Sequence, residues 1–433
     1  MTINTVTVIG ATGTMGANVA GIFASFGSAK VYIVGRNITK VKNTIPRIVN
    51  SVRSDAIAGN LFPVDFSMLE KCVSESDLVF ESSAENMEIK KSIHEKVGKF
   101  LRLDAIACSG TSGLSIAELA GCYPDEKKKN FFGIHFFNPP YSMSLCELTA
   151  TEYSDTCMME SLHSYLDNEL YRTVIEVEDS PAFLANRIGF YFINSALQAA
   201  EKYSANGGID YIDSILGPFT GRNMAPITTA DFVGLDVHKA IVNNIYDNSD
   251  DYAHDAFILP KYVQRLIDEG NLGTKMGCGL YKMDKSDGCR EMLVWDIENN
   301  KYRKAVEYSL PFVEKMRKLI AEGNYEDALT VLLNDSSKEG KICVEFLLKY
   351  IVYAIFAADQ LGDSVEAADD AMATGFNWCP PLALFQALSS VTDVETLIKD
   401  RIPNDIRKVK WEILSNKIIP SKYDYRLYFK SGK

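Results

Sequence analysis

The fold is decided near the N-terminus, where residues 5–16 read TVTVIGATGTMG. The β-branched residues from Thr5 to Ile9 predict a strand, and apolar residues at helical spacing follow as far as Phe26. A glycine-rich turn between a strand and a helix is typical of a dinucleotide site, because glycines let the backbone approach a pyrophosphate and the helix N-terminus supplies N–H groups. The expected cofactor-binding residues here are Gly10, Gly13, Thr14, Met15 and Gly16.

A second strand is predicted at residues 31–34, and the residues after it bear on the choice of cofactor. An NAD-binding chain usually places an acid there to bind the ribose 2′-hydroxyl. This chain has Gly35, Arg36 and Asn37 instead. NAD or NADP is therefore expected, and Arg36 favours NADP because it could bind a 2′-phosphate. The alternative is that Arg36 stacks on the adenine or faces water.

The charge of the chain is unevenly distributed. The net charge is −12, which argues against a nucleic-acid partner. The first 54 residues nevertheless contain no Asp or Glu, and their basic residues are Lys30, Arg36, Lys40, Lys42, Arg47 and Arg53. A positive segment in an acidic chain suits a polyphosphate ligand, and a solvated basic surface is the alternative.

Length and composition predict a soluble globular protein of two or three domains in 433 residues. No targeting pattern is seen, and the most apolar helical segment, residues 343–358, is too short and too charged to span a membrane. The 9 cysteines show neither CxxC pairs nor metal-ligand spacing. These features predict a cytoplasmic protein with reduced thiols, no membrane partner and no metal.

A proton-transfer pair is predicted further along the chain. Residues 130–134 form a probable buried strand that ends at His135-Phe136-Phe137-Asn138-Pro139, and Glu147 follows on the next strand. A neutral imidazole can take a proton from an alcohol, and a carboxylate on its other nitrogen fixes the tautomer. A histidine packed among aromatic residues is the structural alternative.

Several sequence blocks in one order resemble the 3-hydroxyacyl-CoA dehydrogenase family. The resemblance runs from residue 5 to residue 283. Its blocks are Glu81-Ser82-Ser83-Ala84-Glu85-Asn86 with Lys90, Ser109-Gly110-Thr111-Ser112, the His135 block with Glu147, Ser180-Pro181-Ala182-Phe183-Leu184-Ala185-Asn186-Arg187, Asp231-Phe232-Val233-Gly234-Leu235-Asp236, and Gly273-Thr274-Lys275-Met276-Gly277-Cys278-Gly279-Leu280-Tyr281.

The resemblance implies interconversion of 3-hydroxyacyl-CoA and 3-oxoacyl-CoA in fatty acid metabolism. His135 is then the general base, Glu147 holds its imidazole, and Ser112 and Asn186 hydrogen-bond the reacting oxygens of the substrate. The resemblance also assigns four residues to the cofactor pocket: Glu85, Lys90, Asn138 and Lys275.

Some features depart from the family pattern. The glycine turn is one residue longer than usual, and the segment between Arg36 and Glu81, which in relatives helps to build a helical arm over the CoA, is shorter. Two alternative functions therefore stay open. One is a dehydrogenase of a free or carrier-protein-bound 3-hydroxy acid, and the other is a non-catalytic nucleotide-binding homologue.

The expected fold is an α/β Rossmann-type dinucleotide-binding domain followed by an all-α 6-phosphogluconate-dehydrogenase-like C-terminal domain, duplicated. The predicted boundaries are 1–178, 179–290 and 300–433, with residues 283–304 as a polar linker. The duplication is predicted because a long apolar helix at 342–361 and the segments after it repeat the pattern of residues 188–227. The second copy lacks the Asn-Arg pair and should not be catalytic. A monomer with an internal pseudo-dimer, or a homodimer, is expected.

Overall fold

The computed structural model describes residues 2–284 and 290–432. The chain forms two compact units. The first, here called the sheet unit, consists of Met1–Phe183 and Leu361–Asp363. The second, the helical unit, consists of Leu184–Gln360 and Ser364–Lys433.

The sheet unit is built on one sheet with the strand order β3-β2-β1-β4-β5-β6-β7-β8. Strands β1 to β6 run parallel, β7 is antiparallel to β6, and β8 is parallel to β7. The chain reverses its order between β1 and β4, which is where a doubly wound sheet binds its ligands. The strands are β1 Thr5–Ile9, β2 Lys30–Gly35, β3 Leu61–Asp65, β4 Leu78–Glu81, β5 Ile106–Ser109, β6 Phe131–Phe136, β7 Leu145–Thr149 and β8 Thr173–Glu176.

The predicted strand, glycine turn and helix are confirmed at the N-terminus, where β1 leads into α1 (Thr14–Ser25). Gly10 has φ +87°, and a Cβ on it would lie 2.2 Å from the Ser82 carbonyl oxygen after β4. A Cβ on Gly16 would lie 2.6 Å from the carbonyl oxygen of Gly10. Only glycine fits these two positions, so the turn can pass close to both the β4 end and its own helix.

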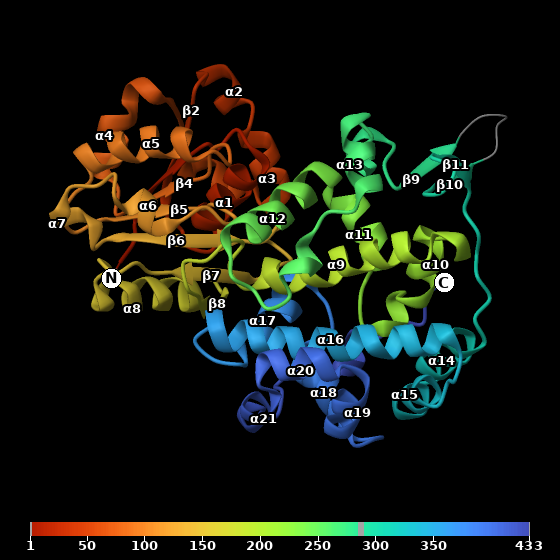
Figure 1. The fold of residues 1–433 in the computed structure, drawn as a ribbon. Helices are drawn as coiled ribbons and strands as arrows, with labels where there is room; N and C mark the ends of the chain where they lie inside the picture. Colours follow the sequence, from red (N-terminus) through yellow and green to blue (C-terminus); the bar gives the residue numbers. More distant parts are fainter. Residues whose placement is uncertain (1, 285–289, 433) are drawn as a thin grey trace. The chain divides into compact units, whose positions relative to one another are not determined.

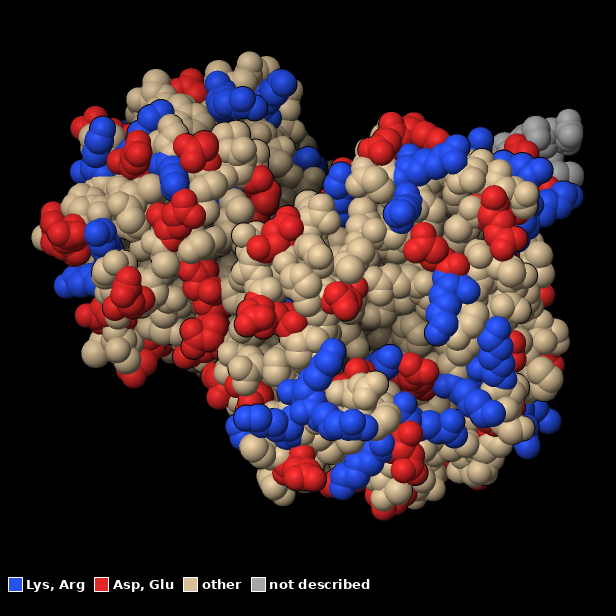
Figure 2. Space-filling view, viewed as in Figure 1, with Lys and Arg blue, Asp and Glu red and all other residues tan. Residues whose placement is uncertain are grey.

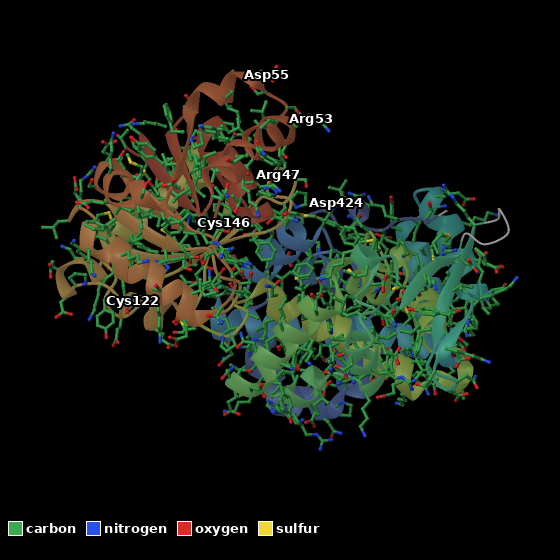
Figure 3. All side chains as sticks on the ribbon, turned by 90° about the horizontal axis from the view of Figure 1, so that it is seen from above. Arg47, Arg53, Asp55, Cys122, Cys146 and Asp424 are labelled. Atoms are coloured by element: carbon green, nitrogen blue, oxygen red, sulfur yellow. The ribbon has the colours of Figure 1, made fainter. Side chains whose placement is uncertain are left out.

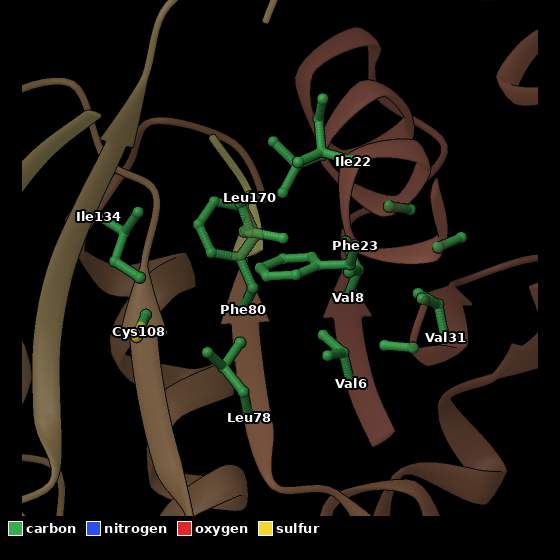
Figure 4. Close-up of a cluster of buried hydrophobic side chains, with 14 of the residues drawn as sticks. Val6, Val8, Ile22, Phe23, Val31, Leu78, Phe80, Cys108, Ile134 and Leu170 are labelled. Carbon is green, nitrogen blue, oxygen red and sulfur yellow. The ribbon is translucent and has the colours of Figure 1, made fainter. Parts of the chain in front are cut away.

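Helices cover the sheet in two layers. On one side α1 packs on α3 (Ile45–Val52), and on the other α4 (Leu69–Glu75), α5 (Met87–Phe100) and α6 (Ile116–Ala120) pack in sequence, as Figure 1 shows for the near face. The core beneath α1 joins β1, β4 and the helix itself, with Phe23 edge-on to Phe80 (Figure 4). This burial of apolar surface holds the glycine turn against the sheet.

A short segment from late in the chain completes the sheet unit. The backbone of Gly362 forms an antiparallel bridge with Val177, just beyond β8. The Glu178 N–H donates to the Leu361 carbonyl at 2.8 Å, and the Asp363 N–H donates to Glu176 at 3.1 Å. Residues 361–363 thereby cover part of the sheet edge that β8 would otherwise expose.

The helical unit is built mostly of helices. These are α9 Ala185–Lys202, α10 Ile209–Ile215, α11 Pro226–Val233, α12 Leu235–Asn248, α13 Lys261–Asp268, α14 Pro311–Ala321, α15 Tyr325–Leu333, α16 Lys338–Leu361, α17 Ala367–Ala371, α18 Pro381–Ser389, α19 Val394–Arg401, α20 Pro403–Val409 and α21 Trp411–Leu414. The long helix predicted at residues 342–361 is α16.

Helices α9 and α16 pack through aromatic residues. Tyr191 stacks on Tyr353 at 3.8 Å between ring centroids, and Phe192 meets Tyr350 edge-on at 5.7 Å. The buried guanidinium of Arg222 lies 3.7 Å from the centre of the Phe192 ring. Such contacts add directional attraction to apolar burial, and they stabilise the packing of α9 on α16.

The prediction of a polar linker at residues 283–304 is wrong. The chain forms a three-stranded antiparallel sheet there, from β9 (Tyr281–Asp284), β10 (Glu291–Asp296) and β11 (Lys301–Lys304). It forms because Val294 and Trp295 are buried and because Arg303 binds both carboxylate oxygens of Asp210 in α10. Long-range pairing of this kind leaves little trace in local hydropathy.

Among the described residues, no helix combines the length and the apolar character needed to cross a membrane.

Candidate active site

The candidate catalytic pair lies on neighbouring strands. His135 near the end of β6 is directly opposite Glu147 of β7 in the antiparallel register. The imidazole Nδ1 lies 2.7 Å from Glu147 Oε2, and the carboxylate is fully buried. An ionised carboxylate only accepts hydrogen bonds, so Nδ1 carries the proton and donates it. The Nε2 atom of the neutral ring is then the proton acceptor.

Aromatic rings surround His135 and fix the plane of its imidazole. The Phe137 ring centroid lies 4.5 Å away and that of Phe183 lies 5.7 Å away. The histidine is 7% exposed, so one part of its surface remains accessible. Packing among aromatic rings therefore leaves His135 room for the predicted proton-transfer role.

The predicted cofactor residues of the sheet unit gather around the glycine turn. Gly13 is the N-cap of α1, whose first turn has no acidic side chain. Asn138 accepts a hydrogen bond at 3.2 Å from the side-chain amide of Asn18 in α1. Thr12, Gly13 and Thr14 are exposed. The turn thus presents free surface and a helix N-terminus that favours negative charge.

Two arginines border this turn. Arg36 is exposed and directly follows β2, as predicted. Arg47 of α3 also reaches the turn, since its Nη2 donates to the carbonyls of Thr12 at 3.1 Å and Gly13 at 3.0 Å. Figure 3 labels Arg47 together with Arg53, which follows α3. The sequence identifies Arg47 only as one of the basic residues of this segment, because a hydrogen bond to a loop so far away in sequence has no local signal.

Glu85 and Ser112 lie on adjacent loops, after β4 and β5. The Glu85 carboxylate accepts the Ser112 N–H at 2.8 Å and the Thr111 hydroxyl at 2.5 Å. These bonds fix the backbone of Ser112, which is partly exposed. Glu85 is itself half-exposed and lies 3.6 Å from the ammonium of Lys90.

Lys90 belongs to a buried polar cluster that the sequence did not predict. Its ammonium lies 3.1 Å from each carboxylate oxygen of Glu81, the last residue of β4. Glu81 also accepts the Ser83 N–H at 2.5 Å and the Ser109 hydroxyl at 2.8 Å. His94 Nε2 lies 3.3 Å from the same carboxylate. Glu81 is thus tied to the loops after β4 and β5, both of which border the site.

In this cluster Glu81 is ionised and His94 is neutral. Burial would raise the pKa of Glu81, but the hydrogen bond from His94 and the charge of Lys90 outweigh it and hold that pKa well below its usual range. Burial lowers the pKa of His94, against the pull of Glu81. A neutral His94 donates from Nε2 to Glu81 and accepts at Nδ1 from the Tyr123 hydroxyl, 2.8 Å away.

The remaining predicted site residues belong to the helical unit. Asn186 is buried in the first turn of α9, and the N-cap of that helix is Leu184, so Asn186 is not a capping residue. Lys275 is partly exposed and forms an ion pair with Asp236. The Asp231 carboxylate accepts the Leu280 N–H at 2.6 Å, which joins two sequence blocks that lie far apart along the chain.

The structure therefore brings His135 and Glu147 together, Glu85 and Ser112 together, and Asn138 next to the helix of the glycine turn. A histidine with an oriented carboxylate, on a strand whose following loop contacts the helix of a nucleotide-type turn, is suited to removing a proton from an alcohol as a hydride leaves.

Comparison with protein families finds a match for the sheet unit and another for the first part of the helical unit. Residues 5–180 match the NAD-binding domain of 3-hydroxyacyl-CoA dehydrogenase, and residues 183–283 match the C-terminal domain of the same family. The two matches together cover more than half of the chain.

Individual relatives agree. The chain is 28% identical over 327 residues to a probable 3-hydroxyacyl-CoA dehydrogenase of Bacillus subtilis, which covers 75% of this chain and 40% of the relative. It is 29% identical over 293 residues to human mitochondrial hydroxyacyl-coenzyme A dehydrogenase, which covers 64% of this chain and 90% of the relative. The chain spans about half the length, or less, of the three first-ranked curated relatives.

A solved structure extends the likeness of fold beyond residue 283. The crystal structure of 3-hydroxybutyryl-CoA dehydrogenase from Escherichia coli K12 superposes with a TM-score of 0.70 at 20% identity, covering 98% of this chain and 97% of that one. On the two family matches and the relatives together, the chain belongs to the 3-hydroxyacyl-CoA dehydrogenase family.

Proposed function

We propose that this chain is an NAD(P)-dependent 3-hydroxyacyl-CoA dehydrogenase that interconverts 3-hydroxyacyl-CoA and 3-oxoacyl-CoA. The observation that carries the proposal is the 2.7 Å bond between His135 Nδ1 and the buried carboxylate of Glu147. It leaves Nε2 as the base. The names of the relatives, which are hydroxyacyl-CoA dehydrogenases, supply the substrate class.

In the oxidative direction, His135 Nε2 accepts the proton of the C3 hydroxyl. The C3–H bond breaks with both electrons leaving as hydride, and C3–O becomes a carbonyl. A bound nicotinamide cofactor would supply the acceptor for that hydride. Glu147 stabilises the imidazolium that forms, since a carboxylate beside a developing cation lowers its energy. In the reductive direction, His135 returns the proton.

Ser112 and Asn186 are proposed to bind the substrate oxygens. Both are neutral donors, which suits an alcohol and a ketone that carry no charge of their own. The nucleotide is proposed to lie on Gly10, Gly13, Thr14, Met15 and Gly16, with Arg36, Glu85, Lys90, Asn138 and Lys275 around it. The residues fit this group, because a Cβ on Gly10 or Gly16 would block the turn and because residues 12–14 are exposed at the N-terminus of α1, which favours negative charge.

The first test is oxidation of NADH or NADPH by acetoacetyl-CoA, followed at the nicotinamide absorbance band. We expect His135→Ala to lower kcat by about 10²–10⁴-fold, the usual contribution of a general base. The matched control is His163→Ala. His163 forms a similar histidine–glutamate pair with Glu176, at 2.9 Å, but both side chains are about one-third exposed. Its loss should leave kcat unchanged.

Other outcomes would redirect the assignment. If His135→Ala kept full activity, the proposed base would be wrong. Turnover of a free or protein-carried 3-hydroxy acid, without competition by 3′,5′-ADP, would favour another acyl carrier over CoA. Nucleotide binding without turnover of any of these substrates would favour a non-catalytic homologue.

We further propose a preference for NADP over NAD. Arg36 stands where an acid would repel a 2′-phosphate, and it is exposed beside the turn. We expect Arg36→Ala to lower kcat/KM with NADPH about tenfold more than with NADH, since a charge-assisted phosphate contact contributes roughly 1.5 kcal/mol. Arg53→Ala, which removes an exposed charge after α3, is the control. A higher kcat/KM with NADH than with NADPH in the unaltered protein would contradict the preference.

We also infer that residues 1–178 form the nucleotide domain, residues 179–290 the catalytic helical domain and residues 300–433 a non-catalytic duplicate of it. A shared local device supports the duplication. Asp213 accepts the Ile227 N–H at 2.8 Å near the start of α11, and Asp369 accepts the Leu382 N–H at 2.7 Å near the start of α18. In both places a proline occupies the first turn of the helix.

A further inference from the structure

A hollow of about 400 Å³ lies on the surface of the helical unit, among α19, α20 and α21. This volume is within the range of small-molecule sites. The proposed dehydrogenase chemistry uses none of its residues. The lining residues are Lys399, Ile406, Arg407, Lys410, Trp411, Glu412 and Ile413.

The charge of the lining is positive in a chain whose net charge is −12. Three of the lining residues are cationic and one is acidic. In the described part of the chain, Arg407 and Lys410 have no ion-pair partner, and both are exposed. Figure 2 shows Lys and Arg side chains gathered over α20 and α21. Unpaired cations around a hollow favour an anionic ligand.

Trp411 supplies an aromatic wall beside these cations. Its side chain lines the hollow and is 1% exposed, so the protein holds the ring in place. Small-molecule sites are lined mainly by apolar and aromatic side chains around a few polar groups, and this hollow has the same make-up.

The backbone at Lys410 is also unusual. Lys410 joins α20 to α21 with φ +54° and ψ +55°, the left-handed region. Glycine is the residue that adopts this conformation without strain. Backbone strain of this kind is concentrated at functional sites. The strained position therefore favours a role for the Lys410 charge in binding a ligand.

We propose that this hollow binds an anionic amphiphile, meaning a phosphate or carboxylate head joined to an apolar body. Lys399, Arg407 and Lys410 attract the head. Ile406, Ile413 and the Trp411 ring contact the apolar body, and Ile413 is 58% exposed, which leaves apolar surface available. The ligand is a free metabolite or the head of an anionic lipid, and the test separates the two.

The experiment titrates the full chain with decyl phosphate at low ionic strength and follows tryptophan fluorescence. The chain has 3 tryptophans, so Trp411→Phe identifies the responding one. We expect saturable binding whose fluorescence change disappears in Trp411→Phe. Binding should weaken as salt is added, because surface charges are screened.

Substitutions at the rim separate binding from folding. Arg407→Gln and Lys410→Gly should each weaken binding about fivefold, the loss expected for one partly exposed charge contact. Lys410→Gly should keep or raise the melting temperature, because glycine relieves the left-handed backbone. Arg401→Gln is the matched control. It removes an exposed charge from α19 that does not line the hollow, and it should leave the affinity unchanged.

Each outcome has a definite meaning. Binding of decyl phosphate with the expected variant pattern supports the site with a soluble ligand. Co-sedimentation with vesicles of phosphatidylglycerol in phosphatidylcholine, lost in Arg407→Gln and Lys410→Gly, supports the same site with a lipid as its source. Inorganic phosphate binding as tightly as decyl phosphate would overturn the apolar part of the site. Failure of both decyl phosphate and the vesicles to bind, or binding that ignores the rim variants, would overturn the proposal.

Discussion

Lys90 is fully buried, and its ammonium contacts both oxygens of the equally buried Glu81. The sequence block that contains both residues pointed to a nucleotide site. In the structure, the same pair also organises the loops after β4 and β5, through Ser83 and Ser109. Residues expected to touch a ligand can therefore depend on a neighbour that holds them in place.

The contribution of the Glu81–Lys90 ion pair to the free energy of unfolding can be measured by removing one charge and then both. Glu81→Gln leaves Lys90 as a buried cation without its principal partner, and we expect a loss of about 3–5 kcal/mol of unfolding free energy. Glu81→Gln combined with Lys90→Met removes both buried charges and should recover most of that loss. Urea denaturation measures both values.

The control for this pair is Glu345→Gln, which breaks an exposed ion pair with Lys349 within α16 and should leave stability almost unchanged. If the double variant were no more stable than Glu81→Gln, the cost would come from the lost hydrogen bonds to Ser83 and Ser109 and not from the isolated lysine.

At the scale of elements, buried carboxyls hold the starts of α11 and α18. Burial raises the pKa of Asp213 and of Asp369 to about 6, against the hydrogen bonds that each accepts. A carboxyl whose pKa is higher in the folded than in the unfolded state binds its proton more tightly when folded. Its contribution to stability is fully present below the unfolded pKa of 3.8 and is lost as pH rises through about 6.

We therefore expect the wild-type protein to gain about 1 kcal/mol of unfolding free energy relative to Asp213→Asn when the pH falls from 7 to 5. The difference between the two proteins is the quantity to measure. Burial lowers the pKa of His94 and His238, so these histidines act on total stability in the opposite direction. Urea titrations at the two pH values give the difference. A difference that does not change with pH would show that Asp213 keeps an ordinary pKa in the fold.

Elements with strong local patterns were predictable, and those that depend on distant partners were not. The alternation in residues 5–9 and the glycine spacing after it identify β1 and the turn, and His135 and Glu147 were paired correctly from the strands that carry them. The sheet of β9 to β11 was missed, because its strands are short and charged and Arg303 is neutralised by Asp210, which lies far away in sequence. The Glu81 cluster was missed for the same reason.

At the scale of the whole chain, α16 covers the aromatic face of α9 within one polypeptide. Tyr191 and Phe192 pack on Tyr353 and Tyr350, so this apolar face already has a partner. Oligomers form where an apolar face lacks one. We therefore expect a monomer, which light scattering coupled to size-exclusion chromatography would show as the mass of one chain. A concentration-independent dimer would contradict this expectation.

The short segment Leu361–Asp363 has a consequence for the order in which the protein can mature. The sheet unit is encoded almost entirely in the first 183 residues, yet the backbone that bridges Val177 leaves the ribosome only after a further stretch of chain has been made. During synthesis the sheet edge beside β8 and Val177 therefore stays exposed until residues 361–363 have been made. We expect a chain ended before Leu361 to aggregate through that border, even though every catalytic residue proposed above would be present.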